Sequence, residues 1–328
     1  MRRGGLAITG YVLRWVRLAV GAGILVVIVG RLGTGPFLDA VRAVDAWALG
    51  AGLGITALTT VCCAWRWRLV ANALGVAVRP RTAVAAYYRS QFLNATLPGG
   101  VLGDVHRGVR HGRGVHAVGR CLRAVVWERS LGQLVQLGLT AVVVLALPSP
   151  FRSSVVAAVA AGVLVALGCL ALLCGARRPA STRPVLRTLV ADMDAIVRVP
   201  RTWSAIVLAS GLAVAGHAAI FLVAVRTAGV TVSAGSVLPL SLLVLLASAV
   251  PVNVAGWGPR EGAAVWAFGA VGLSAAQGVT VAVVYGVMAL FATFPGAVVL
   301  LAEWRRQDVD ENGARRRTAR TLKGALHG

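Results

Sequence analysis

The sequence predicts an all-α protein, a polytopic bundle of transmembrane helices with about eight membrane segments. Of its 328 residues, 58% are hydrophobic and only 13% are charged, and the mean hydropathy is +0.79. A water-soluble core needs far less apolar sequence than this. The charges also cluster between long uncharged runs, several of which reach the roughly 20 residues that cross a bilayer as a helix.

Six full crossings are predicted from the uncharged runs, at about 13–30, 46–65, 124–147, 153–175, 203–225 and 278–302. The first run is short, and Arg14 and Arg17 are expected to extend it by reaching the headgroups. Basic residues before a short apolar stretch are also typical of a cleavable signal peptide. We favour a crossing because the apolar pattern continues along the whole chain.

Two apolar regions are interrupted and do not fit a single crossing. The region 82–112 contains Pro98-Gly99-Gly100, and the region 236–273 contains Pro251 and a glycine-rich stretch at 256–262. Proline and paired glycines stop helices, so each region is predicted to be two short helices that meet at an unwound turn. Such backbone survives at membrane depth only where it faces protein or a wet cavity.

The way in which each interrupted region enters the membrane follows from its flanking charges. Region 82–112 has arginines at both ends, so it is expected to dip into the membrane and return to the cytoplasm. Region 236–273 either dips in from outside or crosses twice with short helices. If both dip, the fold has two opposed re-entrant hairpins, which resembles the inverted-repeat plan of secondary transporters.

The basic residues predict the topology. In a soluble protein a net charge of +22 would suggest nucleic acid, but here 27 basic residues fall in stretches predicted inside and four in stretches predicted outside. We therefore expect a plasma (inner) membrane protein with both termini in the cytoplasm. The expected parts are a cytoplasmic N-terminus at 1–12, a membrane domain at 13–302 with an amphipathic cytoplasmic loop at 176–202, and a basic, disordered tail at 303–328.

Common catalytic and metal-binding patterns are weak or missing. The five cysteines form no CxxC motif, no GxxxxGK[ST] loop occurs, and we expect no metal, no cofactor and no enzymatic activity. Asp192-Met193-Asp194 matches the DxD pattern of metal-dependent glycosyltransferases. The match is short, and both aspartates are expected to be ordinary surface charges on the polar side of an amphipathic helix.

The first interrupted region carries the densest group of polar residues. Gln91 and Asn94 share a helix face before the Pro-Gly turn, and Asp104 is predicted to cap the next helix. Arg107 and Arg110 share a face one turn later, which suits a phosphate. The alternative is a cytoplasmic turn with a capping aspartate and arginines that only orient the chain.

Two further charged pairs lie in apolar surroundings. Glu128 is costly at membrane depth unless paired, so it is expected to bind Arg129, Arg107 or Arg260. A structural ion pair is the favoured role for Glu128, and a functional role is the alternative. Arg260 and Glu261 are the only ionisable groups for about 75 residues. Their isolation favours a functional role for that pair.

Three motifs in order resemble the lysylphosphatidylglycerol synthase transmembrane-region family, also called flippase-like or AglD-like. They are Gln91-Phe92-Leu93-Asn94 with Leu97-Pro98-Gly99-Gly100-Val101-Leu102-Gly103-Asp104 and Arg107, then Trp127-Glu128-Arg129, then Gly256-Trp257-Gly258-Pro259-Arg260-Glu261-Gly262. The resemblance covers about 10–302 and implies lipid translocation or handling. No soluble aminoacyl-transfer domain is expected here, and Trp257 and Pro259 stand where the family often has Leu and Val.

The leading expectation is a translocase for an anionic lipid headgroup, on a phospholipid or a polyprenyl-phosphate-linked sugar. Its expected site comprises Gln91, Asn94, Pro98, Gly99, Gly100, Asp104, Arg107, Arg110, Glu128, Arg129, Asn253, Gly256, Arg260 and Glu261. The arginines are expected to hold the phosphate, and the Pro-Gly turns to act as hinges. The alternatives are a membrane-embedded transferase acting on lipid-linked sugar and a non-catalytic partner of an envelope enzyme. Nucleic acid is not expected as a partner.

Overall fold

The protein is described by a computed structural model that covers residues 23–24, 26–97, 100–147, 149–153, 156, 183–198, 200–249 and 257–305. These residues form helices and turns, with no β-strand among them. The helices are α2 (Gly35–Ala43), α3 (Ala46–Ala73), α4 (Pro80–Thr96), α5 (Leu102–Gly114), α6 (Val118–Ala146), α8 (Arg183–Val197), α9 (Pro200–Thr227), α10 (Ala234–Ser248), α11 (Pro259–Ala270) and α12 (Ala275–Ala292). The predicted all-α class is confirmed.

Four long apolar helices in the described part of the chain can cross a membrane. They are Ala46–Ala73, Val118–Ala146, Arg201–Thr227 and Ala275–Arg305, of 28, 29, 27 and 31 residues. At 1.5 Å per residue each exceeds the roughly 30 Å of a bilayer core. The predicted crossing at 153–175 and most of that at 13–30 lie outside the described residues.

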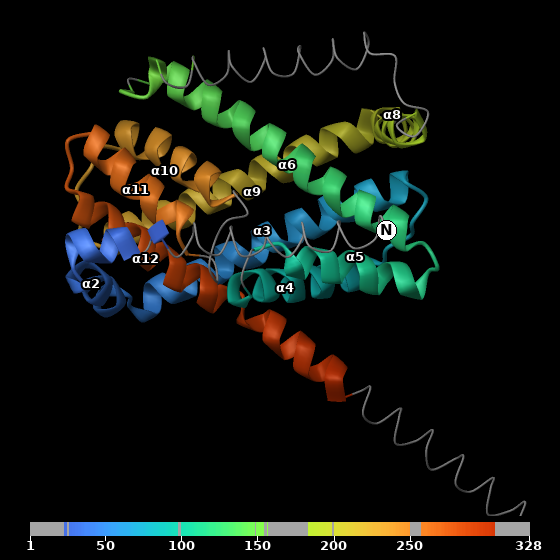
Figure 1. Ribbon diagram of the computed structural model, residues 1–328, viewed down its shortest axis with the longest axis horizontal. Coiled ribbons are helices and arrows are strands. Elements are labelled where there is room, and N and C mark those ends of the chain that lie inside the picture. The colour runs from blue at the N-terminus through green and yellow to red at the C-terminus, as the bar shows by residue number, and fades with distance from the viewer. Residues whose placement is uncertain are drawn as a thin grey trace, which may run out of the picture.

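The two interrupted regions form short helix pairs that enter from opposite ends of the bundle (Figure 1). α4 and α5 have 17 and 13 residues and contact each other, as do α10 and α11 with 15 and 12 residues. Both pairs turn back near the middle of the bundle, and each pair begins and ends at the same side. The 236–273 region therefore dips in and returns rather than crossing twice.

Local sequence explains where these short helices start and stop. α4 ends at Thr96, two residues before Pro98, and α11 begins with Pro259 at its first position, where proline needs no N–H partner. Gly258 precedes it with φ of 128°, a left-handed conformation that glycine adopts without strain. Its N–H donates to Glu261 Oε2 at 2.6 Å, which is the half of a capping box that a glycine can make.

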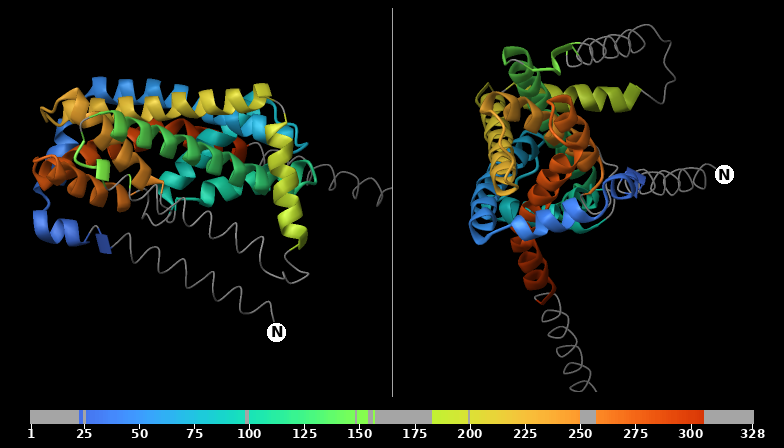
Figure 2. Two further views of the ribbon diagram at one scale, coloured as in Figure 1. Left: turned by 90° about the horizontal axis from the view of Figure 1, so that it is seen from above. Right: turned by 90° about the vertical axis from the view of Figure 1, so that its left-hand side faces the viewer.

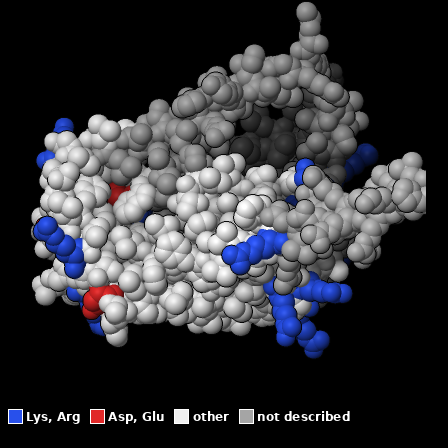
Figure 3. Space-filling model, turned by 90° about the horizontal axis from the view of Figure 1, so that it is seen from below, with Lys and Arg blue, Asp and Glu red and all other residues white. Residues whose placement is uncertain are grey.

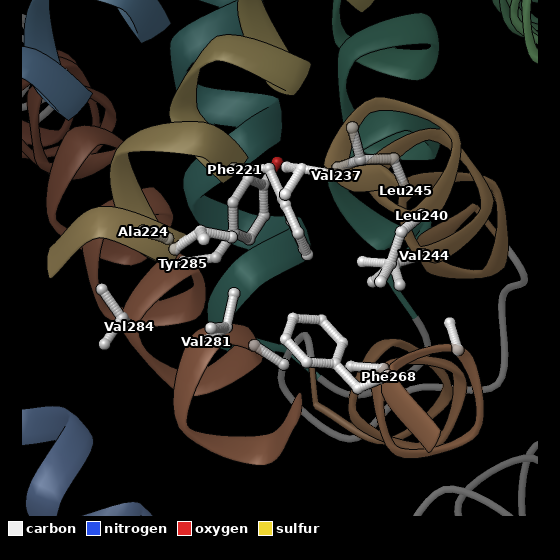
Figure 4. Close-up of a cluster of buried hydrophobic side chains, with 14 of the residues drawn as sticks. Phe221, Ala224, Val237, Leu240, Val244, Leu245, Phe268, Val281, Val284 and Tyr285 are labelled. Atoms are coloured by element: carbon white, nitrogen blue, oxygen red, sulfur yellow. The ribbon is translucent and has the colours of Figure 1, made fainter. Parts of the chain in front are cut away.

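Apolar packing holds the bundle in two clusters. The larger joins α9, α10, α11 and α12 through side chains such as Phe221, Leu240 and Phe268 (Figure 4). The smaller surrounds Trp67 and joins α3, α4 and α6. Many large apolar side chains face outward, among them Leu58 and Val126 at 59% and 62% exposure, as expected for helices in contact with lipid.

The helix α8 lies across one end of the bundle (Figure 2) and corrects one expectation. Asp192 is not a surface charge: it is buried and accepts from Arg123 Nε at 2.6 Å. Asp194 is exposed, and the hydrogen bond from Arg198 lowers the pKa of its carboxyl below the usual range. The two aspartates thus have separate partners, and the described residues contain no group of three or more potential metal ligands.

We predict that the two hairpins are reached from opposite sides of the membrane. In a cysteine-free parent, Arg113→Cys at the end of α5 and Ser233→Cys before α10 place exposed thiols at the two ends of the bundle. A membrane-impermeant maleimide should label Arg113→Cys from one side only and Ser233→Cys from the other. Labelling of both positions from the same side would contradict the opposed arrangement.

Candidate functional site

A cavity of about 340 Å³ lies between the two hairpins, near the middle of the bundle. Residues from α3, α4, α6, α9, α10, α11 and α12 surround it, so both interrupted regions contribute to its wall. Its polar lining residues are Thr56, Arg66, Tyr87, Gln91, Asn94, Arg129, Gln133, Gln136, Ser210, His217, Ser248, Arg260, Tyr285 and Thr293. A cavity of this polarity at membrane depth suits a polar or charged ligand.

Glu128 on α6 is the centre of a buried ion network beside the cavity. Its carboxylate is fully buried and binds Arg66 Nη2 at 2.5 Å and Arg107 Nη2 at 3.1 Å. Tyr87 donates its hydroxyl to the same carboxylate at 3.1 Å. Of the three expected partners Arg107 is found, whereas Arg129 and Arg260 bind other carboxylates.

Asp104 on α5 is the second carboxylate of this network and corrects a prediction. The N-cap of α5 is Val101, and Asp104 makes no cap hydrogen bond. Its oxygens instead accept from Ser90 at 2.9 Å and Asn94 at 3.0 Å, and they pair with Arg107 and Arg129. Asp104 therefore holds the two helices of the first hairpin together and ties them to α6.

Arg107 is fully buried behind the cavity wall. Its guanidinium lies 4.6 Å from the ring centroid of Trp67 and 4.3 Å from that of Tyr87, within cation–π range of both. Arg110, predicted to act beside it, is partly exposed and pairs with Glu303 at 3.0 Å, outside this cavity. The two arginines do not form a joint grip on one anion.

The second hairpin repeats the same arrangement at the start of α11. Arg260 binds Glu261 through Nε at 2.8 Å and Nη2 at 2.5 Å, and its guanidinium lies 5.2 Å from the Trp257 ring and 5.3 Å from the Tyr285 ring. Gly286 on α12 faces it, and a Cβ there would overlap the Arg260 guanidinium and meet Trp257 at 3.0 Å. Each hairpin thus carries an arginine within cation–π range of two aromatic rings and beside a carboxylate.

Comparison with known families agrees with this geometry. The model of the lysylphosphatidylglycerol synthase TM region family matches residues 14–296. The chain belongs to that family. It is therefore an integral membrane protein of a family related to lipid modification or flippase-like function. No curated protein and no solved structure matches the chain.

In this lysylphosphatidylglycerol synthase TM-region protein, the predicted site residues fall into four groups. Gln91, Asn94, Gly100, Arg129 and Arg260 line the cavity. Asp104, Arg107, Glu128 and Glu261 are buried behind that lining. Arg110 lies elsewhere, and Pro98, Gly99, Asn253 and Gly256 lie outside the described residues.

Several cavity residues were not predicted from sequence. Arg66 was counted among cytoplasmic charges, but it is buried within α3 and also donates to Ser210 on α9 at 3.0 Å. Gln133 and Gln136 lie one turn apart on α6, directly after the Glu128-Arg129 motif, and this spacing was a signal that the sequence offered. No comparable spacing of polar residues marked His217 in the sequence.

The charges around the cavity are not balanced. The first network contains three arginines and two carboxylates, so it has a net charge of +1 although each arginine binds a carboxylate, whereas Arg260 and Glu261 balance each other. Arg66, Arg129 and Arg260 line the cavity, but no carboxylate of the described residues does. A buried charge is costly unless paired, so the cavity favours one anionic group.

We predict that Glu128→Ala strongly destabilises the protein. The substitution leaves Arg66 and Arg107 without their shared carboxylate, and breaking such a buried pair costs about 3–5 kcal/mol. Thermal unfolding in detergent should show a lower Tm than the wild type. Asp194→Asn, which removes an exposed pair, is the control and should leave the Tm unchanged. Equal shifts for the two variants would contradict this role for Glu128.

Proposed function

We propose that this protein binds an anionic lipid headgroup in the central cavity and moves it between the leaflets of the membrane. The observation that carries the proposal is the cavity lining, where three guanidinium groups face inward and their carboxylate partners stand behind them. Arginine is the side chain best suited to the paired oxygens of a phosphate, because its planar fork donates two parallel hydrogen bonds.

The charge balance supports a ligand with a single negative charge at its phosphate. A phosphodiester supplies one negative charge, which matches the net charge of +1 of the first network. The side-chain amides of Gln91, Gln133 and Gln136 offer hydrogen bonds to hydroxyl groups of the headgroup. Phosphatidylglycerol and a polyprenyl-phosphate-linked sugar both have this chemistry.

The same lining disfavours a headgroup that carries an amino acid. A lysyl or alanyl ester adds ammonium groups, which would face Arg66, Arg129 and Arg260 with no described carboxylate in the cavity wall to balance them. We therefore propose that the ligand has a net negative headgroup rather than an aminoacylated one.

The opposed hairpins offer a physical route for movement. Both hairpins line the cavity, through residues such as Asn94 and Ser248, so tilting one of them would open the cavity toward one end of the bundle and leave the other end closed. The chain has no GxxxxGK[ST] loop, so we propose downhill exchange or coupling to an ion rather than ATP use within this chain.

The distribution of arginines supports a plasma-membrane orientation with both termini in the cytoplasm. The end of the bundle that carries α5 and α8 holds many arginines, among them Arg113, Arg120 and Arg198. Figure 3 shows basic side chains at both ends of one face. By the positive-inside rule this end faces the cytoplasm.

The alternative functions are a membrane-embedded transferase and a non-catalytic membrane partner, and no cavity feature of the described residues favours either.

We predict that the neutral pair variant Arg260→Gln/Glu261→Gln lowers lipid exchange. It removes a cavity cation without leaving its buried carboxylate unpaired, and losing one hydrogen-bonded arginine costs about 1.5–3 kcal/mol of headgroup binding, roughly a tenfold to hundredfold loss. The measurement is leaflet exchange of fluorescent phosphatidylglycerol in liposomes that contain the purified protein.

The matched control is Arg226→Gln, which removes an exposed arginine at the end of α9. It should exchange lipid at the wild-type rate. Absence of exchange by the wild type with every anionic lipid tested would contradict the proposed function. Equal exchange rates for the wild type and the pair variant would show that Arg260 has no part in the proposed function.

A further inference from the structure

A second cavity of about 520 Å³ lies at the basic end of the bundle, between α4 and α5. It shares no lining residue with the central cavity. Its charged lining residues are Arg81, Arg89, Arg110 and Glu303. Three arginines therefore face one carboxylate, which leaves two positive charges unbalanced within the described lining.

Arg89 is the most buried of the charged side chains that line this second cavity. Only 4% of Arg89 is exposed, and its Nη1 donates to both oxygens of Glu303 at 2.6 Å. Arg110 Nη1 binds Glu303 Oε2 at 3.0 Å. The Nε of Arg89 is buried and has no hydrogen-bond partner among the described residues. A buried guanidinium donor without a partner is energetically costly, so Arg89 favours a further acceptor.

Glu303 comes from a distant part of the chain and shows what the cavity accepts. It lies at the end of the last membrane helix, whose residue Phe294 contacts Phe92 of α4 with ring centroids 6.4 Å apart. Its two oxygens occupy the position between Arg89 and Arg110 that two oxygens of a phosphate would take. The carboxylate is thus a resident counterion from the same chain.

The depth of the cavity points to a lipid as the source of the phosphate. Trp304, next to Glu303, is 62% exposed, and exposed tryptophans mark the headgroup level of a membrane. Basic pockets between membrane helices at this level suit anionic headgroups. Val115 at the rim is also exposed, which gives an apolar edge beside the charges.

We propose that this second cavity binds the phosphate of an anionic phospholipid from the adjoining leaflet, in competition with Glu303. This site does not depend on the central cavity, and it would hold a lipid whether or not the protein moves lipid. Arg81 and Arg110 bind the outer oxygens of the phosphate, and Arg89 binds from the buried side. Release of Glu303 frees the end of the last membrane helix from the first hairpin.

The test measures binding of short-chain phosphatidylglycerol to purified protein in neutral detergent. All variants carry Arg260→Gln/Glu261→Gln, so that the central cavity contributes little. Glu303→Gln removes the competing charge and should tighten binding by about tenfold or more. Arg81→Gln/Arg110→Gln changes two partly exposed arginines, is expected to fold, and should weaken binding by a similar factor. Arg226→Gln is the control and should bind like its parent.

Inorganic phosphate is the second ligand in the same experiment. Tighter phosphatidylglycerol binding without a matching gain for inorganic phosphate supports a lipid site. An equal gain for inorganic phosphate would overturn the lipid assignment. If phosphatidylglycerol binds the Arg81→Gln/Arg110→Gln variant as tightly as it binds the parent, the site itself is wrong, whatever the behaviour of Glu303→Gln. Lipid exchange by the central cavity is a separate measurement, so its failure leaves this result intact.

Discussion

The buried carboxylate of Glu128 is the constraint on which the rest of the bundle depends. In a membrane, apolar helices gain little by packing against each other rather than against lipid, so polar contacts carry much of the information about which helices meet. Through Arg66, Arg107 and Tyr87, Glu128 joins α6 to α3, α5 and α4, and Arg66 extends the connection to α9. Moving any of these helices would expose a charge to the apolar interior.

The two hairpins stabilise a buried arginine in the same way. Each has, near the start of its second helix, an arginine that lies within cation–π range of two aromatic rings and binds a neighbouring carboxylate. The rings and the carboxylate replace part of the water that a guanidinium would otherwise need, and Nε and Nη1 of Arg107 have no hydrogen-bond partner among the described residues. The two hairpins differ in one respect, because the charges of the second balance within one pair, whereas those of the first are shared among α3, α5 and α6.

Local features of the sequence were enough to predict the hairpins but not the network. Pro98, Pro251 and the glycine-rich stretch break helices by their own backbone chemistry, and the isolation of Arg260 and Glu261 made their pairing predictable. Arg66 and Glu128 are 62 positions apart, so nothing in the local pattern linked them, and α3 was predicted to end before Arg66 although it continues to Ala73. Asp104 was assigned to its nearest helix end because the sequence shows a cap position but not the arginines that compete for the carboxylate.

The shared network of the first hairpin also limits how this sequence can diverge. Asp104 and Glu128 each bind two arginines, so replacing either carboxylate alone leaves at least one buried guanidinium group without that partner, and a tolerated change would have to replace an arginine as well. The outward-facing apolar residues of α6 are not constrained in this way, because one apolar side chain can replace another in contact with lipid. We therefore expect amino-acid substitutions to accumulate quickly at the lipid-facing positions and to occur in pairs within the buried ion network.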